Sequence, residues 1–307
     1  MKISILLPYK ENFSPDYPGA VSLFINDTLN ESKYRKKIVV FGNTKFSKIF
    51  NHKYYNLKTS RNFLKSLNRR YVEEFIKVEK KNKSKIIEVH NRPIYIKYIN
   101  KELQNRKIIF YFHNDPLTMN GSSNITERIY LLKFCDKIIF NSLWVQKRFL
   151  QDLNSEELNY DKLIVINQSA KKSKILLKNK KKIITFVGKL NKSKGYDIYK
   201  DAIIRILDEY KNWKAYSIGD EDRDRPYINH ARHFELGFLE HRNVLKFLDK
   251  SEIAVVPSRW EEPFGRTALE SSSRACATII SNKGGLPETT DYSLILKQLN
   301  ADSLYKS

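Results

Sequence analysis

The sequence predicts an α/β protein with two doubly wound, Rossmann-like domains, on three observations. Short β-branched runs recur along the chain and alternate with stretches suited to helices. Polar or glycine-containing turns follow these runs, at the strand ends where open α/β sheets bind ligands. A length of 307 residues corresponds to about two domains. We expect the domains at residues 1–170 and 183–307, joined by a lysine-rich linker at residues 171–182.

The first domain is predicted to begin with a strand at Lys2–Leu7, a loop, and a helix that starts near Gly19. This order lets backbone approach a diphosphate, although an ordinary turn would give the same pattern. A basic helix is expected over residues 62–81, and Ser142 should cap another helix. Further strands are predicted at Lys37–Phe41, Lys85–Val89, Lys107–Phe112, within residues 135–142, and at Leu163–Ile166.

Two of these strands end in similar polar segments, His90-Asn91-Arg92-Pro93 and His113-Asn114-Asp115-Pro116. Imidazole and amide groups at successive strand ends should point to one place, as a binding site requires. Segments of this composition also form ordinary turns. The sequence therefore predicts His113 as a candidate site residue, and an ordinary turn remains the alternative interpretation of this segment.

The second domain is predicted to repeat the pattern. A strand at Ile183–Val187 leads into the loop Gly188–Gly195 and a helix at Tyr196–Tyr210. Later strands are expected at Lys214–Ile218, His233–Leu236 and Ile253–Val256.

The last of these strands opens the stretch Val255–Glu270, around which the chain is organised. Pro263 fits the first turn of a helix, because its fixed φ suits that turn and its missing N–H is not needed there. The helix should continue over residues 267–275. Backbone N–H groups around Phe264, Gly265 and Arg266 would then face an anion such as a phosphate.

This stretch reads Pro-Ser-x-x-x-Glu-Pro-Phe-Gly with a second carboxylate at Glu270, and Gly284-Gly285-Leu286-Pro287-Glu288 follows it. It resembles the retaining glycosyltransferases of GT-B architecture, the group called family four. The resemblance runs from the first strand to about Glu288. It implies two domains that face each other across a cleft, and transfer of a sugar from a nucleotide-diphosphate sugar to an acceptor hydroxyl with retention, in lipopolysaccharide or surface polysaccharide synthesis.

The resemblance also implies roles for single residues. Lys189 and Lys194 would stabilise the leaving diphosphate, Glu262 and His113 would hold the sugar, and Glu270 would hold the ribose. The remaining donor contacts would come from backbone at Gly19, Gly188, Phe264, Gly265, Arg266 and Thr267. It implies no cofactor and no metal, and we interpret Asp222 and Asp224 as a solvated turn.

Two departures from the family pattern keep an alternative open. Lys189 stands where an arginine is usual, which loses the bidentate geometry and keeps the charge. Ala275 stands where a glycine is usual. A non-catalytic protein that binds nucleotide sugars or polyanions would keep this fold. A glucan phosphorylase or synthase is a weaker rival, because its pyridoxal-phosphate lysine motif is not apparent.

The chain has a net charge of +22, and residues 31–107 hold 22 Lys/Arg and 6 Asp/Glu, so 22 − 6 = +16 of it lies there. A basic face for an anionic membrane and a lipid-linked or glycan acceptor would explain this, and so would ordinary solvated helices. Nucleic acid is disfavoured, since no nucleic-acid module is visible. There is no run of about 20 apolar residues. Cys135 and Cys276 are expected as buried thiols, which favours the cytoplasm.

The C-terminal part is predicted to hold a short strand at Leu294–Leu296 and a helix start capped by Asp302. Family members usually continue with further helices. We therefore expect a shortened chain whose second domain exposes apolar surface.

Overall fold

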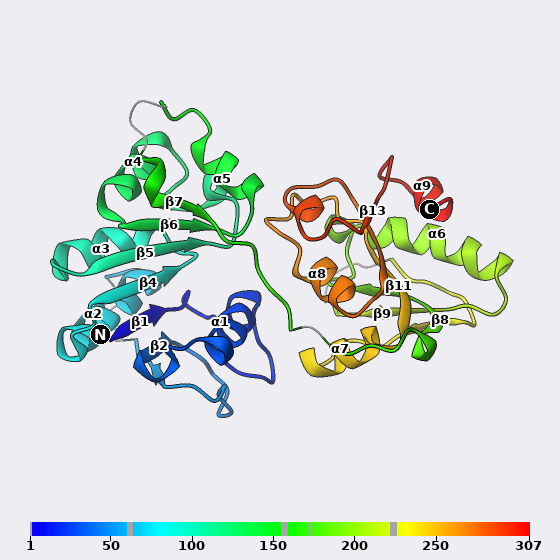
Figure 1. Cartoon of the computed structure of the whole chain (residues 1–307), viewed down its shortest axis with the longest axis horizontal. Helices are drawn as coiled ribbons and strands as arrows, with labels where there is room; N and C mark the ends of the chain where they lie inside the picture. The colour runs from blue at the N-terminus through cyan, green and yellow to red at the C-terminus, as the bar shows by residue number, and fades with distance from the viewer. Residues whose placement is uncertain (1, 60–63, 155–158, 172, 222–225) are drawn as a thin grey trace. The chain divides into compact units, whose positions relative to one another are not determined.

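A computed structural model describes residues 2–59, 64–154, 159–171, 173–221 and 226–307. The chain divides into two compact units, Met1–Gln168 and Ser169–Ser307. Each unit is a parallel sheet with helices on both faces (Figure 1). The predicted α/β class with two doubly wound domains is therefore confirmed.

Unit 1 holds a seven-stranded sheet in the order β3-β2-β1-β4-β5-β6-β7. Strand order reverses beside β1, which pairs in parallel with both β2 and β4. Its strands are β1 (Ile3–Leu6), β2 (Ile38–Gly42), β3 (Tyr54–Asn56), β4 (Ile86–His90), β5 (Lys107–Phe112), β6 (Lys137–Phe140) and β7 (Leu163–Val165). Its helices are α1 (Ala20–Glu31), α2 (Leu67–Asn82), α3 (Ile94–Glu102), α4 (Ile125–Phe134) and α5 (Leu143–Leu150).

Alternation along the strands makes two cores in unit 1. Ile5 of β1 packs with Phe24 and Ile25 of α1, whereas its neighbour Leu6 packs on the other face with helices such as α2. Ser142 caps α5 as predicted, because its side chain accepts a hydrogen bond from the Val145 N–H at 3.0 Å. Cys135 is a buried free thiol, again as predicted.

Unit 2 holds a six-stranded sheet in the order β10-β9-β8-β11-β12-β13, and its order reverses between β8 and β11. Helix α6 covers one face and α7 the other. The strands are β8 (Lys181–Val187), β9 (Lys214–Ile218), β10 (His233–Glu235), β11 (Ser251–Val256), β12 (Ala277–Ile280) and β13 (Leu294–Ile295). The helices are α6 (Tyr196–Glu209), α7 (His241–Leu248), α8 (Arg266–Ser273) and α9 (Ala301–Tyr305).

The prediction that Asp302 caps the last helix is wrong. The cap of α9 is Asn300, whose side chain accepts from the Ser303 N–H at 2.8 Å, and Asp302 lies in the first turn. There it pairs with Arg205 of α6 at 2.5 Å. Packing on α6 therefore holds a helix that would be too short to be stable alone.

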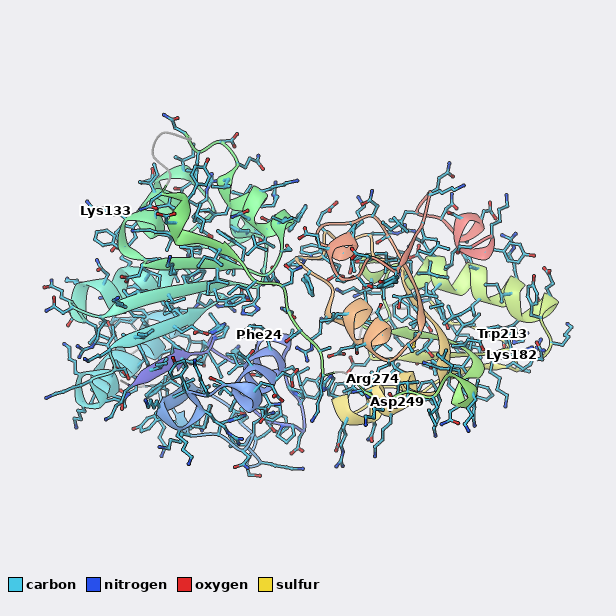
Figure 2. The ribbon with its side chains drawn as sticks, in the orientation of Figure 1. Phe24, Lys133, Lys182, Trp213, Asp249 and Arg274 are labelled. Carbon is cyan, nitrogen blue, oxygen red and sulfur yellow. The ribbon has the colours of Figure 1, made fainter. Side chains whose placement is uncertain are left out.

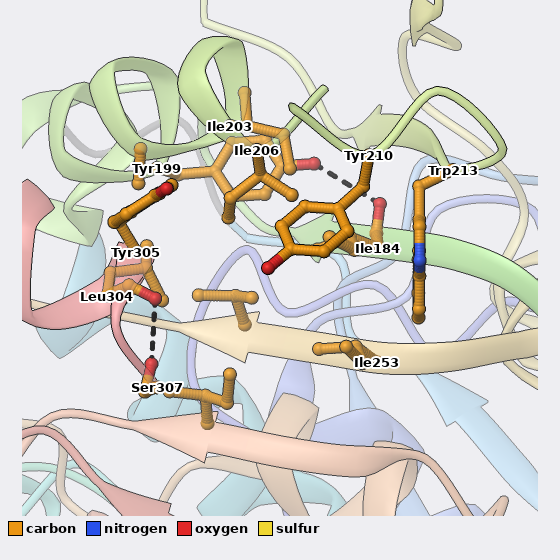
Figure 3. A pocket seen from close by; sticks show the side chains of 13 residues that line it. Ile184, Tyr199, Ile203, Ile206, Tyr210, Trp213, Ile253, Leu304, Tyr305 and Ser307 are labelled. Carbon is orange, nitrogen blue, oxygen red and sulfur yellow. Dashed lines mark hydrogen bonds between the residues drawn. The ribbon is translucent and has the colours of Figure 1, made fainter. Parts of the chain in front are cut away.

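An apolar pocket of about 230 Å³ lies between α6, the sheet and α9. Figure 3 shows the residues around it, among them Ile203 and Ile206 of α6, Ile253 of β11, and Trp213, which precedes β9. Its lining is mostly apolar.

Ala275 adopts a left-handed conformation with φ of 57° directly after α8. The Cys276 N–H reaches back to the Ser271 carbonyl at 3.0 Å, which is the helix ending that glycine normally provides. The preceding residue, Arg274, pairs with Asp249 at 2.9 Å (Figure 2), so this helix end is fixed in place. The structure thus gives a physical reason why glycine would suit position 275.

We expect Ala275→Gly to raise the melting temperature by a few degrees, because relief of a left-handed alanine is worth about 1 kcal/mol. The matched control is Ala202→Gly inside α6, where added backbone freedom should lower the melting temperature. Thermal unfolding followed by circular dichroism measures both. A lower melting temperature for Ala275→Gly would contradict this account of the helix end.

Candidate functional site

Two loops of unit 2 meet where its strand order reverses, which is where open α/β sheets bind ligands. One loop follows β8 and the other follows β11. They are packed so closely that a Cβ on Gly195 would lie 1.9 Å from the Pro257 carbonyl oxygen. Gly195 also has φ of 72°, so no other residue fits this contact without strain.

An ion pair joins the two loops across this point. The Lys194 ammonium binds Oε1 of Glu262, and the Ser258 hydroxyl donates to the same oxygen at 2.9 Å. Ser258 is fully buried, so its hydroxyl fixes the carboxylate from inside the protein. Two predicted site residues that are 68 positions apart in sequence therefore lie in contact.

Two adjacent glycines that follow β12 contact the backbone of Glu262. The Gly285 N–H donates to the Glu262 carbonyl at 2.6 Å, and a Cβ on Gly284 would lie 2.2 Å from the same oxygen. The Gly284 N–H donates to the neighbouring Glu261 carboxylate at 2.6 Å. This motif therefore positions the loop that carries Glu262.

The prediction that Pro263 lies in the first turn of the next helix is wrong. Helix α8 begins at Arg266, after Gly265 with φ of 114°. A residue in that conformation interrupts any helix begun earlier, so Pro263 remains in the loop. The N–H groups of Arg266 and Thr267 now form the start of the helix, where the helix dipole favours an anion. The Phe264 side chain is buried, so only its backbone can reach a ligand.

Glu270 is buried within α8, and two side chains donate hydrogen bonds to its carboxylate. The His241 ring donates from Nε2 to Oε1 at 2.8 Å, and the Arg266 guanidinium donates from Nε to the same oxygen at 2.6 Å. Burial by itself raises the pKa of Glu270, but these two partners outweigh it, and the pKa is lowered. Both contacts use Oε1, so among the described residues Oε2 is left for a hydroxyl donor.

Lys189 and Gly188 follow β8 at the same edge of the sheet. Lys189 is exposed and forms no ion pair within the part of the chain that the structure describes. Gly188 donates its N–H to the Ile218 carbonyl at 2.9 Å and so belongs to the strand connection. The edge therefore presents two lysines, a helix N-terminus and the carboxylates of Glu262 and Glu270.

In unit 1, the predicted meeting of the two polar strand ends is confirmed. His90 Nδ1 and His113 Nε2 lie 2.8 Å apart, and both rings are buried. The His113 N–H also donates to Asn91 Oδ1 at 3.2 Å. The role of His113 toward a sugar stays a prediction.

Gly19 has a neighbour that the sequence did not reveal. A Cβ on Gly19 would lie 2.2 Å from the Glu11 carboxylate, which accepts the Ser22 N–H at 2.9 Å in the first turn of α1. Burial raises the pKa of Glu11. A phosphate contact at Gly19 stays a prediction, and it requires this carboxylate to move.

No group of three or more His, Cys, Asp or Glu side chains suited to a metal ion occurs in the described ranges. Asp222 and Asp224, interpreted above as a turn, lie outside them. No helix among the described residues is both long and apolar enough to cross a bilayer.

Residues 167–304, nearly all of unit 2, match the sequence model of the family described as "Glycosyl transferases group 1". Spore coat protein SA of Bacillus subtilis is 28% identical over 124 residues, which cover 36% of this chain and 33% of that protein. An uncharacterized glycosyltransferase of Methanocaldococcus jannaschii is 33% identical over 114 residues, 35% of this chain and 29% of that protein. The matched stretch thus spans about a third of each relative.

The fold of the whole chain resembles that of two solved structures. The Anabaena protein Alr3699/HepE, crystallised with UDP and glucose, superposes with a TM-score of 0.73 at 15% identity, over 100% of this chain and 88% of that one. A glycosyltransferase from Rickettsia africae gives a TM-score of 0.71 at 17% identity, over 99% and 86%. The two-domain GT-B-like fold follows from these matches together with the two parallel sheets.

Proposed function

We propose that this protein is a glycosyltransferase that moves a sugar from a nucleotide-diphosphate sugar to an acceptor hydroxyl. The observation that supports this most is the Lys194–Glu262 pair at the point of strand reversal in unit 2. It lies inside the stretch that matches the group 1 family. A cation for a diphosphate and a carboxylate for sugar hydroxyls are what such a donor needs at that edge.

The donor would lie along the loops after β8 and β11. Lys194 and Lys189 bind the diphosphate together with the N–H groups of Gly265, Arg266 and Thr267. Lysine ammonium carries three N–H bonds, so Lys194 can bind phosphate while it keeps Glu262. Glu262 accepts hydrogen bonds from the sugar, and Oε2 of Glu270 accepts one from the ribose. That Alr3699/HepE was crystallised with UDP and glucose supports a nucleotide of this kind.

We further propose transfer of a hexose with retention of the anomeric configuration. The bond between the anomeric carbon and the diphosphate breaks, and the electron pair leaves with the phosphate oxygen. The acceptor oxygen bonds to the same face of the sugar, and its proton passes to the leaving phosphate. Lys194, Lys189 and the dipole of α8 stabilise the charge that develops on the diphosphate. No protein nucleophile and no cofactor take part.

A panel of nucleotide sugars, assayed for free nucleotide with and without glycan acceptors, tests this proposal. Release of nucleotide from one donor, faster with an acceptor, supports an enzyme. Binding of donors without release in any combination would instead support the alternative, a binding protein with this fold. The configuration of the product, read by proton NMR, tests retention separately.

We expect turnover to persist when divalent metals are removed with a chelator. The positive charge that a metal would place on the diphosphate is supplied here by Lys189, Lys194 and the α8 N-terminus. Initial rates with and without EDTA measure this. If EDTA abolished turnover and Mn²⁺ restored it, the expectation would be contradicted. A metal ion would then be the group that binds the diphosphate.

We propose that unit 1 rests on the cytoplasmic face of an anionic membrane, where a lipid-linked or surface-polysaccharide acceptor is available. A groove of about 830 Å³ between α2 and α3 is lined by six cationic and two acidic side chains. Lys80 and Arg69 pair with Glu102 and Glu73 at 2.8 and 3.1 Å. Lys81, Lys97 and Lys101 form no ion pair within the described ranges and are left to meet anionic headgroups.

We expect binding to anionic vesicles at low salt that collapses as salt rises, because exposed charges are screened within about 8 Å at physiological salt. Replacing Lys81, Lys97 and Lys101 together with glutamine should weaken vesicle binding about 100-fold, at about 1 kcal/mol per lysine. The control replaces Lys200, Lys211 and Lys246 of unit 2 in the same way. Equal binding to neutral and anionic vesicles in a flotation assay would contradict the membrane role.

A further inference from the structure

A second basic groove lies on unit 2, at the edge of the sheet where its strands begin. It has a volume of about 710 Å³ and is formed by residues 173–181, which lead into β8, and by the two residues before β11. The two parts meet where the Lys181 N–H donates to the Lys250 carbonyl at 2.8 Å. The loops proposed to bind the donor follow β8 and β11, so they lie at the opposite edge of this sheet.

The side chain of Lys180 fixes segment 173–181 to the body of unit 2. Its ammonium group has three N–H bonds and contacts three backbone carbonyls, those of Leu248 at 3.0 Å, Ser251 at 2.6 Å and Arg274 at 2.6 Å. These carbonyls lie at the end of α7, at the start of β11 and just after α8. One lysine therefore holds the segment against three elements of the domain.

Two adjacent leucines of this segment are exposed. The exposed fraction is 57% for Leu176 and 72% for Leu177. They belong to a 3-10 turn in which the Asn179 N–H donates to the Leu176 carbonyl at 2.9 Å and the Lys180 N–H donates to the Leu177 carbonyl at 3.0 Å. A single exposed leucine is ordinary on a protein surface. Two neighbours in a turn that Lys180 holds in place form a small apolar surface at a fixed position.

The groove beside these leucines carries an excess of positive charge. Its acidic side chain, Asp249, is already paired with Arg274 at 2.9 Å. Four exposed lysines line the groove and form no ion pair within the described ranges: Lys174, Lys178, Lys181 and Lys250. Such lysines attract anionic headgroups, and leucines gain free energy when they enter the boundary between headgroups and acyl chains. A nucleic acid or a soluble polyanion would use the lysines alone and leave the leucines in water.

We propose that segment 173–181 and Lys250 form a contact with an anionic bilayer, in which Leu176 and Leu177 insert at the headgroup boundary and the lysines bind the headgroups. The proposal extends to unit 2 the membrane role proposed above for unit 1. A small apolar anchor alone binds a bilayer only marginally, and a basic patch beside it makes the binding stable. Contact at this edge of the sheet leaves the donor loops at the other edge open to a nucleotide sugar.

A fluorophore attached to the full chain at Leu177→Cys tests the insertion directly. Cys135 and Cys276 are buried, so an environment-sensitive dye should react with the introduced thiol. With vesicles of phosphatidylglycerol and phosphatidylcholine its emission should shift to shorter wavelength, and brominated acyl chains should quench it. The matched control is Leu236→Cys, an exposed leucine that follows β10 at the opposite edge of the sheet, where neither change should occur.

Flotation with the same vesicles separates the apolar and ionic parts of the contact. Leu176→Ser combined with Leu177→Ser should weaken binding about tenfold at every salt concentration, because it reduces apolar burial and keeps every charge. Replacing Lys174, Lys178 and Lys181 together with glutamine should weaken binding about 100-fold at low salt and flatten its salt dependence. All five side chains are exposed, and Lys180 is kept, so both variants should fold.

The dye shift at Leu177→Cys should persist when Lys81, Lys97 and Lys101 of unit 1 are replaced with glutamine and enough vesicle is added to restore binding. An unshifted dye on vesicle-bound protein, or no vesicle binding at all, would overturn the proposal. So would a leucine variant that binds vesicles as tightly as the wild type while the lysine variant loses vesicles and duplex DNA alike, since that is a general polyanion site. No nucleotide sugar enters these measurements, so they are independent of whether the chain transfers a sugar.

Discussion

Glu262→Gln is expected to lower kcat by about two to three orders of magnitude while it leaves affinity for the free nucleoside diphosphate within about threefold. Loss of one charged group that stabilises a transition state typically costs this much. Glutamine keeps the shape and can still accept from Ser258, so the loop should stay in place. Lys194 loses its partner and remains available to the diphosphate. Steady-state rates and titration calorimetry measure the two effects.

Glu261→Gln is the matched control, since it removes a carboxylate from the adjacent position. Glu261 binds Lys283 at 3.1 Å and the Gly284 N–H, and we assign it no contact with the sugar. Its variant should keep kcat within a few-fold of the wild type. An equal fall in kcat for both variants would mean that Glu262 acts only by holding the loop.

Glu270→Gln is expected to weaken binding of the nucleoside diphosphate by about 10- to 100-fold. A hydrogen bond from a ribose hydroxyl to a carboxylate contributes about 1.5–3 kcal/mol. The change also removes the carboxylate charge that pairs with Arg266 at 2.6 Å, so stability should fall as well. A thermal melt must therefore accompany the calorimetry.

His241→Gln separates these two effects. It keeps the Glu270 carboxylate and its pair with Arg266, so the loss of nucleotide affinity should be smaller than in Glu270→Gln. Wild-type affinity in a folded Glu270→Gln protein would contradict the ribose assignment. So would an equal loss of nucleotide affinity in Glu262→Gln.

Strand positions were predictable because burial on both faces produces β-branched runs of four to seven residues. The predicted bounds of β5 and β9 agree with the structure. β3 is three residues long and partly exposed, and α7 is only eight residues long. Neither produces a periodic pattern long enough to predict. Pro263 misled the prediction because the φ of Gly265, a neighbour two positions on, determined where α8 begins.

Within the site, the sequence motif predicted which residues belong to it, and the structure shows which side chains each of them contacts. Lys194 and Glu262 were both assigned to the donor, but their contact depends on a sheet order that places β8 beside β11. His241 and Glu11 were missed because a single polar residue at the start of an unpredicted helix, or inside a loop, has no sequence signal. Ser258 has no sequence signal of its own, and its hydrogen bond to Glu262 appears only once the loop is folded.

The central claim, that the loops after β8 and β11 of unit 2 hold a nucleoside diphosphate, is tested most directly by amide spectra of the ¹⁵N-labelled chain during titration with UDP, GDP and ADP. The account predicts that at least one nucleotide shifts the signals of Lys189, Lys194, Gly265, Arg266 and Thr267, with no comparable change along α2. No shift with any of the three, or shifts confined to unit 1, would contradict it.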